Sequence, residues 1–230
     1  MKTRHLILIG CLAALSAPGQ GFVNLNFESA RPAPFMSNGT TYSSFATAFP
    51  GWVGYFGTTP AANVLLNDYT LGSSGLSLMN QPAGQFGGPI SNYTALLQGG
   101  GAPFFADVAL AQTGVVPDGT RSLHFLSSST FGYPVNPFVV TLNGQPVSVS
   151  ILQDFPSTFP TLHEFVADIS AFANRTAELR FTQPHGPSGE NNFFLDNIAF
   201  SPNPVPEPSV WALLALGGAA FWSAMRRRRK

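Results

Sequence analysis

Few residues in this chain stand at spacings that support catalysis. No second histidine or cysteine lies within three to five residues of His124, His163 or His185, and paired zinc ligands usually come at that spacing. The lone cysteine, Cys11, lies in an apolar N-terminal run, so no thiol nucleophile is expected in the folded protein. No serine stands in a Gly-x-Ser-x-Gly motif, and the glycine pairs lack the lysine of a phosphate-binding loop. This pattern favours a non-enzymatic protein.

Carboxylates are the catalytic groups that the sequence leaves open. The ten acids between residues 22 and 204 could include an acid and base pair of the glycosidase kind. The separation of two carboxylates is set by the fold, so the sequence alone does not decide this point. A secreted glycoside hydrolase therefore stays an alternative.

Aromatic side chains are the candidates for ligand binding. The chain has 21 phenylalanines, and most of them are expected to fill a core because aromatic side chains bury large areas. Tyr55 lies close to Trp52, and Tyr133 lies in a segment rich in glycine and proline. These two tyrosines are the candidates for stacking on a sugar.

Charge is unevenly distributed along the chain. The formal net charge is zero, but seven of the eleven basic residues lie within the first four and the last five positions. Residues 22–204 hold four arginines, no lysine and ten acids, which is a net charge of −6. Nucleic acids and anionic lipid surfaces both call for clusters of lysine and arginine. Neither is expected as a partner of this body.

Both ends of the chain are typical of targeting segments. Residues 1–21 have a basic flank, an apolar run and small residues at the end, as in a signal peptide that signal peptidase removes. Residues 202–209 are predicted to form a proline-rich linker, and 210–225 an apolar transmembrane helix. The basic cluster at 226–230 should stay cytoplasmic, which places the body, 22–201, outside.

The body is predicted to be all-β. It is rich in turn-forming residues and shows no long helical period. The clearest hairpin joins 138–142 to 147–151 across Asn143-Gly144, a pair that favours a tight turn with positive φ. One short helical turn is expected at 168–173. The other strands are expected at 23–27, 52–56, 64–66, 76–79, 94–98, 122–126, 163–167, 177–182 and 192–200. Many short strands without long helices favour an antiparallel β-sandwich of the jelly-roll type.

The C-terminal segment carries a recognisable motif. It consists of Val205, Pro206, Glu207, Pro208 and Ser209. Followed by an apolar stretch and a basic cluster, this motif resembles the PEP-CTERM sorting domain. That domain occurs in Gram-negative bacteria together with exosortase, an envelope enzyme that resembles a transpeptidase. The resemblance implies processing at the motif after transient membrane anchoring, and export to the cell surface or extracellular matrix, often with exopolysaccharide.

The body also resembles galactose-binding-like jelly rolls, which include carbohydrate-binding modules. The resemblance is carried by residues 24–28 (NLNFE), 50–52 (PGW) and 194–198 (FLDNI). In such modules the first and last strands pair, and an acid from each end can bind a structural calcium ion. Glu28 and Asp196 are the matching acids, and carboxylate oxygens suit Ca²⁺. The alternative is that both acids only accept hydrogen bonds from the local backbone.

The sequence thus predicts an exported, exosortase-sorted protein with a non-enzymatic jelly-roll body that associates with polysaccharide. A purely structural surface protein without a ligand and a secreted hydrolase are the alternatives. Processing at the motif would leave the mature protein without the predicted membrane span.

Overall fold

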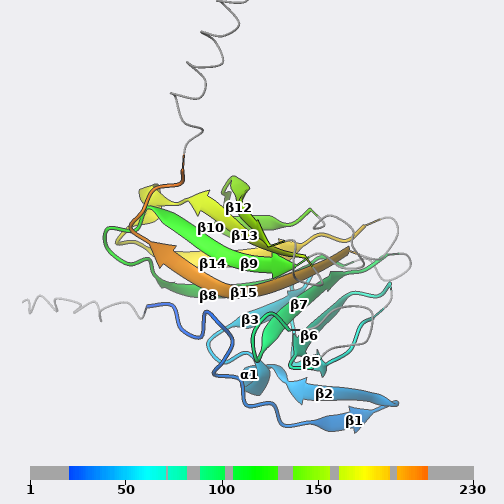
Figure 1. Ribbon diagram of the computed structural model, residues 1–230. Coiled ribbons are helices and arrows are strands. Elements are labelled where there is room, and N and C mark those ends of the chain that lie inside the picture. The colour runs from blue at the N-terminus through cyan, green and yellow to red at the C-terminus, as the bar shows by residue number, and fades with distance from the viewer. Residues whose placement is uncertain are drawn as a thin grey trace, which may run out of the picture.

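The computed structural model describes residues 21–70, 72–81, 89–101, 106–128, 137–155, 161–186 and 191–206. These residues form two sheets (Figure 1). The nine-stranded sheet has the order β1 (Phe35–Ser37), β2 (Thr40–Ser44), β5 (Asn63–Leu66), β6 (Gly75–Met79), β7 (Thr94–Gly99), β15 (Asn191–Ser201), β9 (Ser122–Ser128), β13 (Leu162–Asp168) and β12 (Val149–Phe155). The six-stranded sheet has the order β11 (Gln145–Pro146), β10 (Val139–Leu142), β14 (Thr176–Gln183), β8 (Val108–Val115), β3 (Val53–Phe56) and β4 (Thr59–Pro60). A short helix, α1 (Phe45–Ala48), and a 3-10 turn, η2 (Ser170–Phe172), complete the described elements.

One core rich in aromatic residues lies between the two sheets. Strand β14 alternates strictly and buries Ala177, Leu179 and Phe181 on one face. The ring of Phe181 meets Phe125 of β9 across the sandwich, with 5.2 Å between the ring centroids. In Figure 1 the strands β9, β13 and β15 lie over β8 and β14. The all-β prediction is confirmed, whereas the jelly-roll type stays a prediction.

Strand β15 joins the two halves of the large sheet. Its first part pairs with β7, and its second part pairs with β9. The register shifts between Asp196 and Ala199, and Asn197 at this irregularity has a φ of 47°. Such a bulge bends the strand and re-aims its side chains. This bend lies where the candidate site residues gather.

Most predicted strands are present, but three details differ. Residues 23–27 form turns because Asn24 and Phe27 adopt positive φ angles of 51° and 58°. That segment still lies beside the last strand, since Ile198 N donates to Leu25 O at 2.9 Å. The antiparallel prediction is wrong for β5 and β6, which pair in parallel.

The third difference concerns the predicted hairpin. Asn143 and Gly144 form its turn with φ angles of 50° and 73°, as expected. The pairing with β10 ends near Pro146, which forms part of the two-residue strand β11. Residues 149–155 then cross to the other sheet and pair with β13. The hairpin is therefore short, and its predicted second arm forms the edge of the large sheet.

The described part of the chain contains no helix that is long and apolar enough to cross a membrane. Residues 1–20 of the predicted signal peptide, the predicted span at 210–225 and the basic tail at 226–230 lie outside the described residues. Gly21, the last residue of that predicted peptide, forms a bridge with Val115.

Candidate functional site

The start of the sorting segment is fixed to the folded body. Ser122 Oγ donates to Asn203 O at 2.7 Å, and Asn203 N donates to Ser201 Oγ at 3.1 Å. Val205 and Pro206 follow directly, at the end of β15 where the chain leaves the body (Figure 1). The other predicted motif residues, Glu207, Pro208 and Ser209, lie outside the described residues. The sorting motif thus begins at the surface of the sandwich.

Glu28 and Asp196, the two acids predicted to bind calcium, come from opposite ends of the body and meet at the loop before β7. Ser91 Oγ lies 2.9 Å from Glu28 Oε1 and 2.6 Å from Asp196 Oδ2. Asn92 Nδ2 donates to Glu28 Oε2 at 2.9 Å, and Thr94 Oγ1 donates to Asp196 Oδ2 at 2.7 Å. A single serine hydroxyl therefore bridges the two carboxyl groups.

The Ser91 hydroxyl has more acceptors around it than it has protons to donate. Ser91 has one hydroxyl proton, yet its Oγ has three acceptors within reach, namely both carboxylates and the carbonyl of Tyr93 at 3.1 Å. Burial raises the pKa of Asp196 to about 6, against the opposing effect of its hydrogen bonds from Ser91 and Thr94. A proton on Asp196 can donate to Ser91 Oγ and so completes the network.

Glu28 behaves in the opposite way. Burial acts to raise its pKa, but the hydrogen bonds from Asn92, from the backbone N–H of Tyr93 and from Ser91 together lower the pKa below its usual range. Glu28 therefore stays ionised beside an Asp196 that holds a proton up to about pH 6. A bound cation could take the place of that proton.

The oxygen atoms around Ser91 are of the kind that Ca²⁺ prefers, whereas the N–H groups of Asn92 and Tyr93 already donate to Glu28. Every polar atom that reaches the bridging Ser91 hydroxyl is a carboxylate or carbonyl oxygen, the hard ligand that Ca²⁺ prefers. Within the described ranges no group of three or more His, Cys, Asp or Glu residues converges as a metal site would require. Calcium at Glu28 and Asp196 stays a prediction.

Tyr55 lies on β3, on the outer face of the six-stranded sheet. The guanidinium carbon of Arg180 lies 4.3 Å from the centroid of its ring, and Arg180 Nε donates to Glu178 Oε1 at 3.0 Å. One face of the Tyr55 ring is therefore covered by a cation, and the small side chain of Ala109 stands opposite it on β8. The other predicted aromatic contact, Tyr133, lies outside the described residues.

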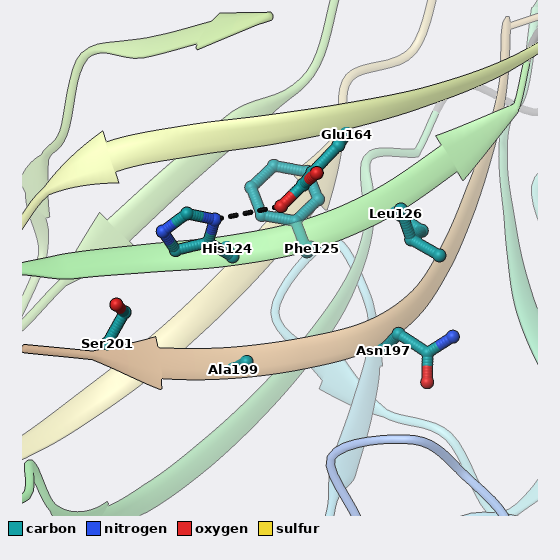
Figure 2. A pocket seen from close by; sticks show the side chains of 7 residues that line it. All are labelled: His124, Phe125, Leu126, Glu164, Asn197, Ala199 and Ser201. Carbon is teal, nitrogen blue, oxygen red and sulfur yellow. Dashed lines mark hydrogen bonds and ion pairs between the residues drawn. The ribbon is translucent and has the colours of Figure 1, made fainter. Parts of the chain in front are cut away.

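A shallow hollow of about 390 Å³ lies on the outer face of β9, β13 and β15. Figure 2 shows its polar side chains rising from three neighbouring strands, with the small side chain of Ala199 between Asn197 and Ser201. His124 and Ala199 stand directly opposite each other in the register of β9 and β15. The hollow follows from the bulge in β15 and from the small residue at its centre.

The imidazole of His124 is held on both sides. Its Nδ1 lies 2.9 Å from Glu164 Oε1, and its Nε2 lies 3.0 Å from Ser122 Oγ (Figure 2 shows the contact with Glu164). Ser122 Oγ also donates to the carbonyl of Asn203, so this hydroxyl links the His124 ring to the end of the body. The ring therefore has a fixed orientation, and its contacts reach the start of the sorting segment.

Sequence reasoning placed His124 in an alternating strand but did not pair it. Leu123 and Phe125 point into the core, so the alternation alone puts His124 on the outer face. Its partner Glu164 lies 40 residues further along the chain, on a strand whose register with β9 no local pattern reveals. The sequence therefore shows that His124 faces outward, but it does not show which residue of the neighbouring strand lies beside it.

The comparisons with known proteins identify the tail. The PEP-CTERM protein-sorting motif matches residues 204–229. The chain carries this motif, which implies an exported protein that exosortase processes and that is sorted to the cell surface.

The body has no comparable match. No curated protein sequence matches the chain. The crystal structure of the enzymatically active domain of bacteriophage CBA120 tailspike protein 4 is similar over 66% of this chain and 19% of that chain, with 13% identity and a TM-score of 0.36. A likeness at this level supports no conclusion about the body. The resemblance to galactose-binding-like modules stays a prediction.

Proposed function

We propose that this protein is an exosortase substrate of the cell surface or extracellular matrix of a Gram-negative bacterium, and that its β-sandwich associates with exopolysaccharide without catalysis. The observation that carries the proposal is the PEP-CTERM motif, which starts three residues after the last strand of the sandwich. Ser122 Oγ holds Asn203 at the end of the body, so the motif starts at the edge of the fold. The sandwich remains as the exported part.

Polysaccharide is the partner class that the body supports best. The net charge of −6 over residues 22–204, with no lysine, disfavours nucleic acid and anionic lipid. The outer face around Tyr55 combines an aromatic ring, a guanidinium group over one face of that ring and the small side chain of Ala109, which together offer aromatic and polar contacts to a sugar. In this proposal Tyr55 and Tyr133 contact the sugar.

Affinity electrophoresis of the exported protein in gels that contain the producing strain's own exopolysaccharide tests this proposal. We expect retarded migration and no release of reducing ends, since the body is proposed to bind and not to cleave. Tyr55→Ala should weaken the retardation, and Tyr42→Ala, a substitution of a tyrosine at the distant edge of the large sheet, should not. Unretarded migration of the wild-type protein would contradict polysaccharide binding, and hydrolysis that one carboxylate substitution abolishes would establish the enzyme alternative.

We further propose a structural calcium ion held by Glu28 and Asp196. The support is the excess of acceptors around the Ser91 hydroxyl, which a cation would balance as well as a proton. Bound there, the ion would tie the segment before β1 to the bulge in β15. Its role in this proposal is to stabilise the fold, and no chemical step depends on it.

A further inference from the structure

The hollow on the large sheet offers a ligand site on the face of the sandwich opposite Tyr55. We propose that it binds one neutral hexopyranose unit of a polysaccharide, an inference that rests on the proposed function and names a site for it. The hollow is open at the surface, so a sugar chain can continue beyond the unit that occupies it. Its volume of about 390 Å³ lies at the small end of ligand pockets, which span about 300–1,000 Å³.

Three side chains around the hollow keep unused hydrogen-bonding capacity. Glu164 engages Oε1 with His124, whereas its Oε2 has no partner in the described part of the chain. The side-chain amide of Asn197 likewise has no partner there and offers both a donor and an acceptor. Ser201 accepts from Asn203 N and keeps its own proton to donate. Sugar hydroxyls, which donate and accept at once, match this mixed set.

The remaining lining, from Phe125, Leu126 and Ala199, is apolar. Leu126 and Ala199 lie between the polar groups and offer a surface for the C–H face of a pyranose ring. The bulge in β15 directs Asn197 to one end of the hollow, while Ser201 stands at the other end (Figure 2). His124 is fixed between Glu164 and Ser122, so little side-chain freedom is lost when a ligand binds.

Charge selects the class of sugar. Glu164 brings a carboxylate to the rim of the hollow, and the body as a whole carries a net charge of −6. A uronic acid would place a second carboxylate beside the first, and like charges in contact are unfavourable. The hollow therefore suits neutral hexoses and rejects acidic ones.

Two substitutions in the exported protein test the site, each with a matched control. Glu164→Gln removes the acceptor charge, and its control, Asp154→Asn, disrupts the other carboxylate–histidine pair of strand β13, outside the hollow. Asn197→Gly removes the side-chain amide, and glycine tolerates the positive φ of this position. Its control, Asn174→Gly, makes the same change at an exposed position with positive φ outside the hollow. Galactomannan, a neutral β-glucan and polygalacturonate serve as probes in isothermal titration calorimetry, and thermal unfolding confirms that each variant folds.

We expect the neutral polymers to bind and each hollow variant to lose about tenfold in affinity, since each substitution weakens or removes a hydrogen bond to the sugar. The control variants should bind like the wild type, and polygalacturonate should bind to none. Neutral polymers that bind equally well to the hollow variants but are lost on Tyr55→Ala would overturn this site and leave the proposed function intact. A wild-type protein that binds no polysaccharide would overturn both, and a preference for polygalacturonate would overturn the assignment of a neutral sugar.

Discussion

Replacing Asp196 with asparagine should remove a distinctive pH dependence of folding stability. Burial raises the pKa of Asp196 from 3.8 to about 6, so the folded state binds this proton more tightly than the unfolded chain does. The free energy of unfolding therefore falls as the pH rises from about 4 to about 6. One pKa unit corresponds to about 1.4 kcal/mol, so the full fall is about 3 kcal/mol in the absence of metal.

Other acids act in a lower pH range and do not mask this effect. The pKa values of Glu28, Asp107 and Asp168 are lowered. At Glu28 and Asp107 hydrogen bonds outweigh burial, and at Asp168 the carboxylate accepts hydrogen bonds from Ser170. Their contribution to stability is present above their ordinary pKa values and is lost as the pH falls further. The difference between the wild type and Asp196→Asn isolates the buried acid, because an amide does not titrate.

Urea unfolding of EDTA-treated exported protein at pH 4.5, 5.5, 6.5 and 7.5 measures this difference. We expect the wild type to lose stability relative to Asp196→Asn as the pH rises, and the difference to level off above about pH 6.5. A difference that is constant across this range, or that changes in the opposite direction, would refute the assignment of a buried proton to Asp196.

Calcium should compete with the same proton. At pH 7.5 calcium should raise the unfolding free energy of the wild type, by about 2.7 kcal/mol at one hundred times its Kd, and the gain should shrink at pH 5. Glu28→Gln and Asp196→Asn should lose most of the gain. A wild type that does not respond to calcium at pH 7.5 would refute the calcium proposal and leave the proton assignment standing.

Two further predictions concern the packing of the sandwich. Phe125→Ala should cost about 3–5 kcal/mol in urea unfolding, because this fully buried ring contacts four other phenylalanines; a cost below about 1 kcal/mol would contradict the aromatic core. Gly99→Ala should destabilise by at least about 1–3 kcal/mol, because a Cβ at this position would meet the backbone carbonyl of Pro184. A cost below about 0.5 kcal/mol would show that the close approach to the Pro184 carbonyl is not rigid.

The sequence could predict the strands with clear alternation but not those of mixed pattern. Strand β14 alternates between core and surface residues, and its prediction is confirmed. Strand β8 was missed because it is buried along most of its length and its run of Ala, Gln and Gly residues shows no strong β pattern. The strand predicted at 23–27 is absent because Asn24 and Phe27 adopt positive φ angles, which the local sequence pattern does not reveal.

The candidate sites show the same limit. Glu28 and Asp196 were candidates because the resemblance to galactose-binding-like modules implies an acid at each end of the body; both contact Ser91, and the calcium site stays a prediction. The sequence could not predict that Ser91 bridges the two acids, because this serine lies 63 residues from Glu28 and 105 residues from Asp196 along the chain. The pair of His124 and Glu164 likewise depends on the register between β9 and β13, which tertiary packing sets.

Intact mass spectrometry of the protein recovered from the cell surface tests the central claim most directly. Exosortase-positive cells should yield a chain that ends at the motif near residues 206–208 and lacks residues 210–230, whereas cells without exosortase should retain the full tail. Surface protein from exosortase-positive cells that still ends at Lys230 would contradict the account.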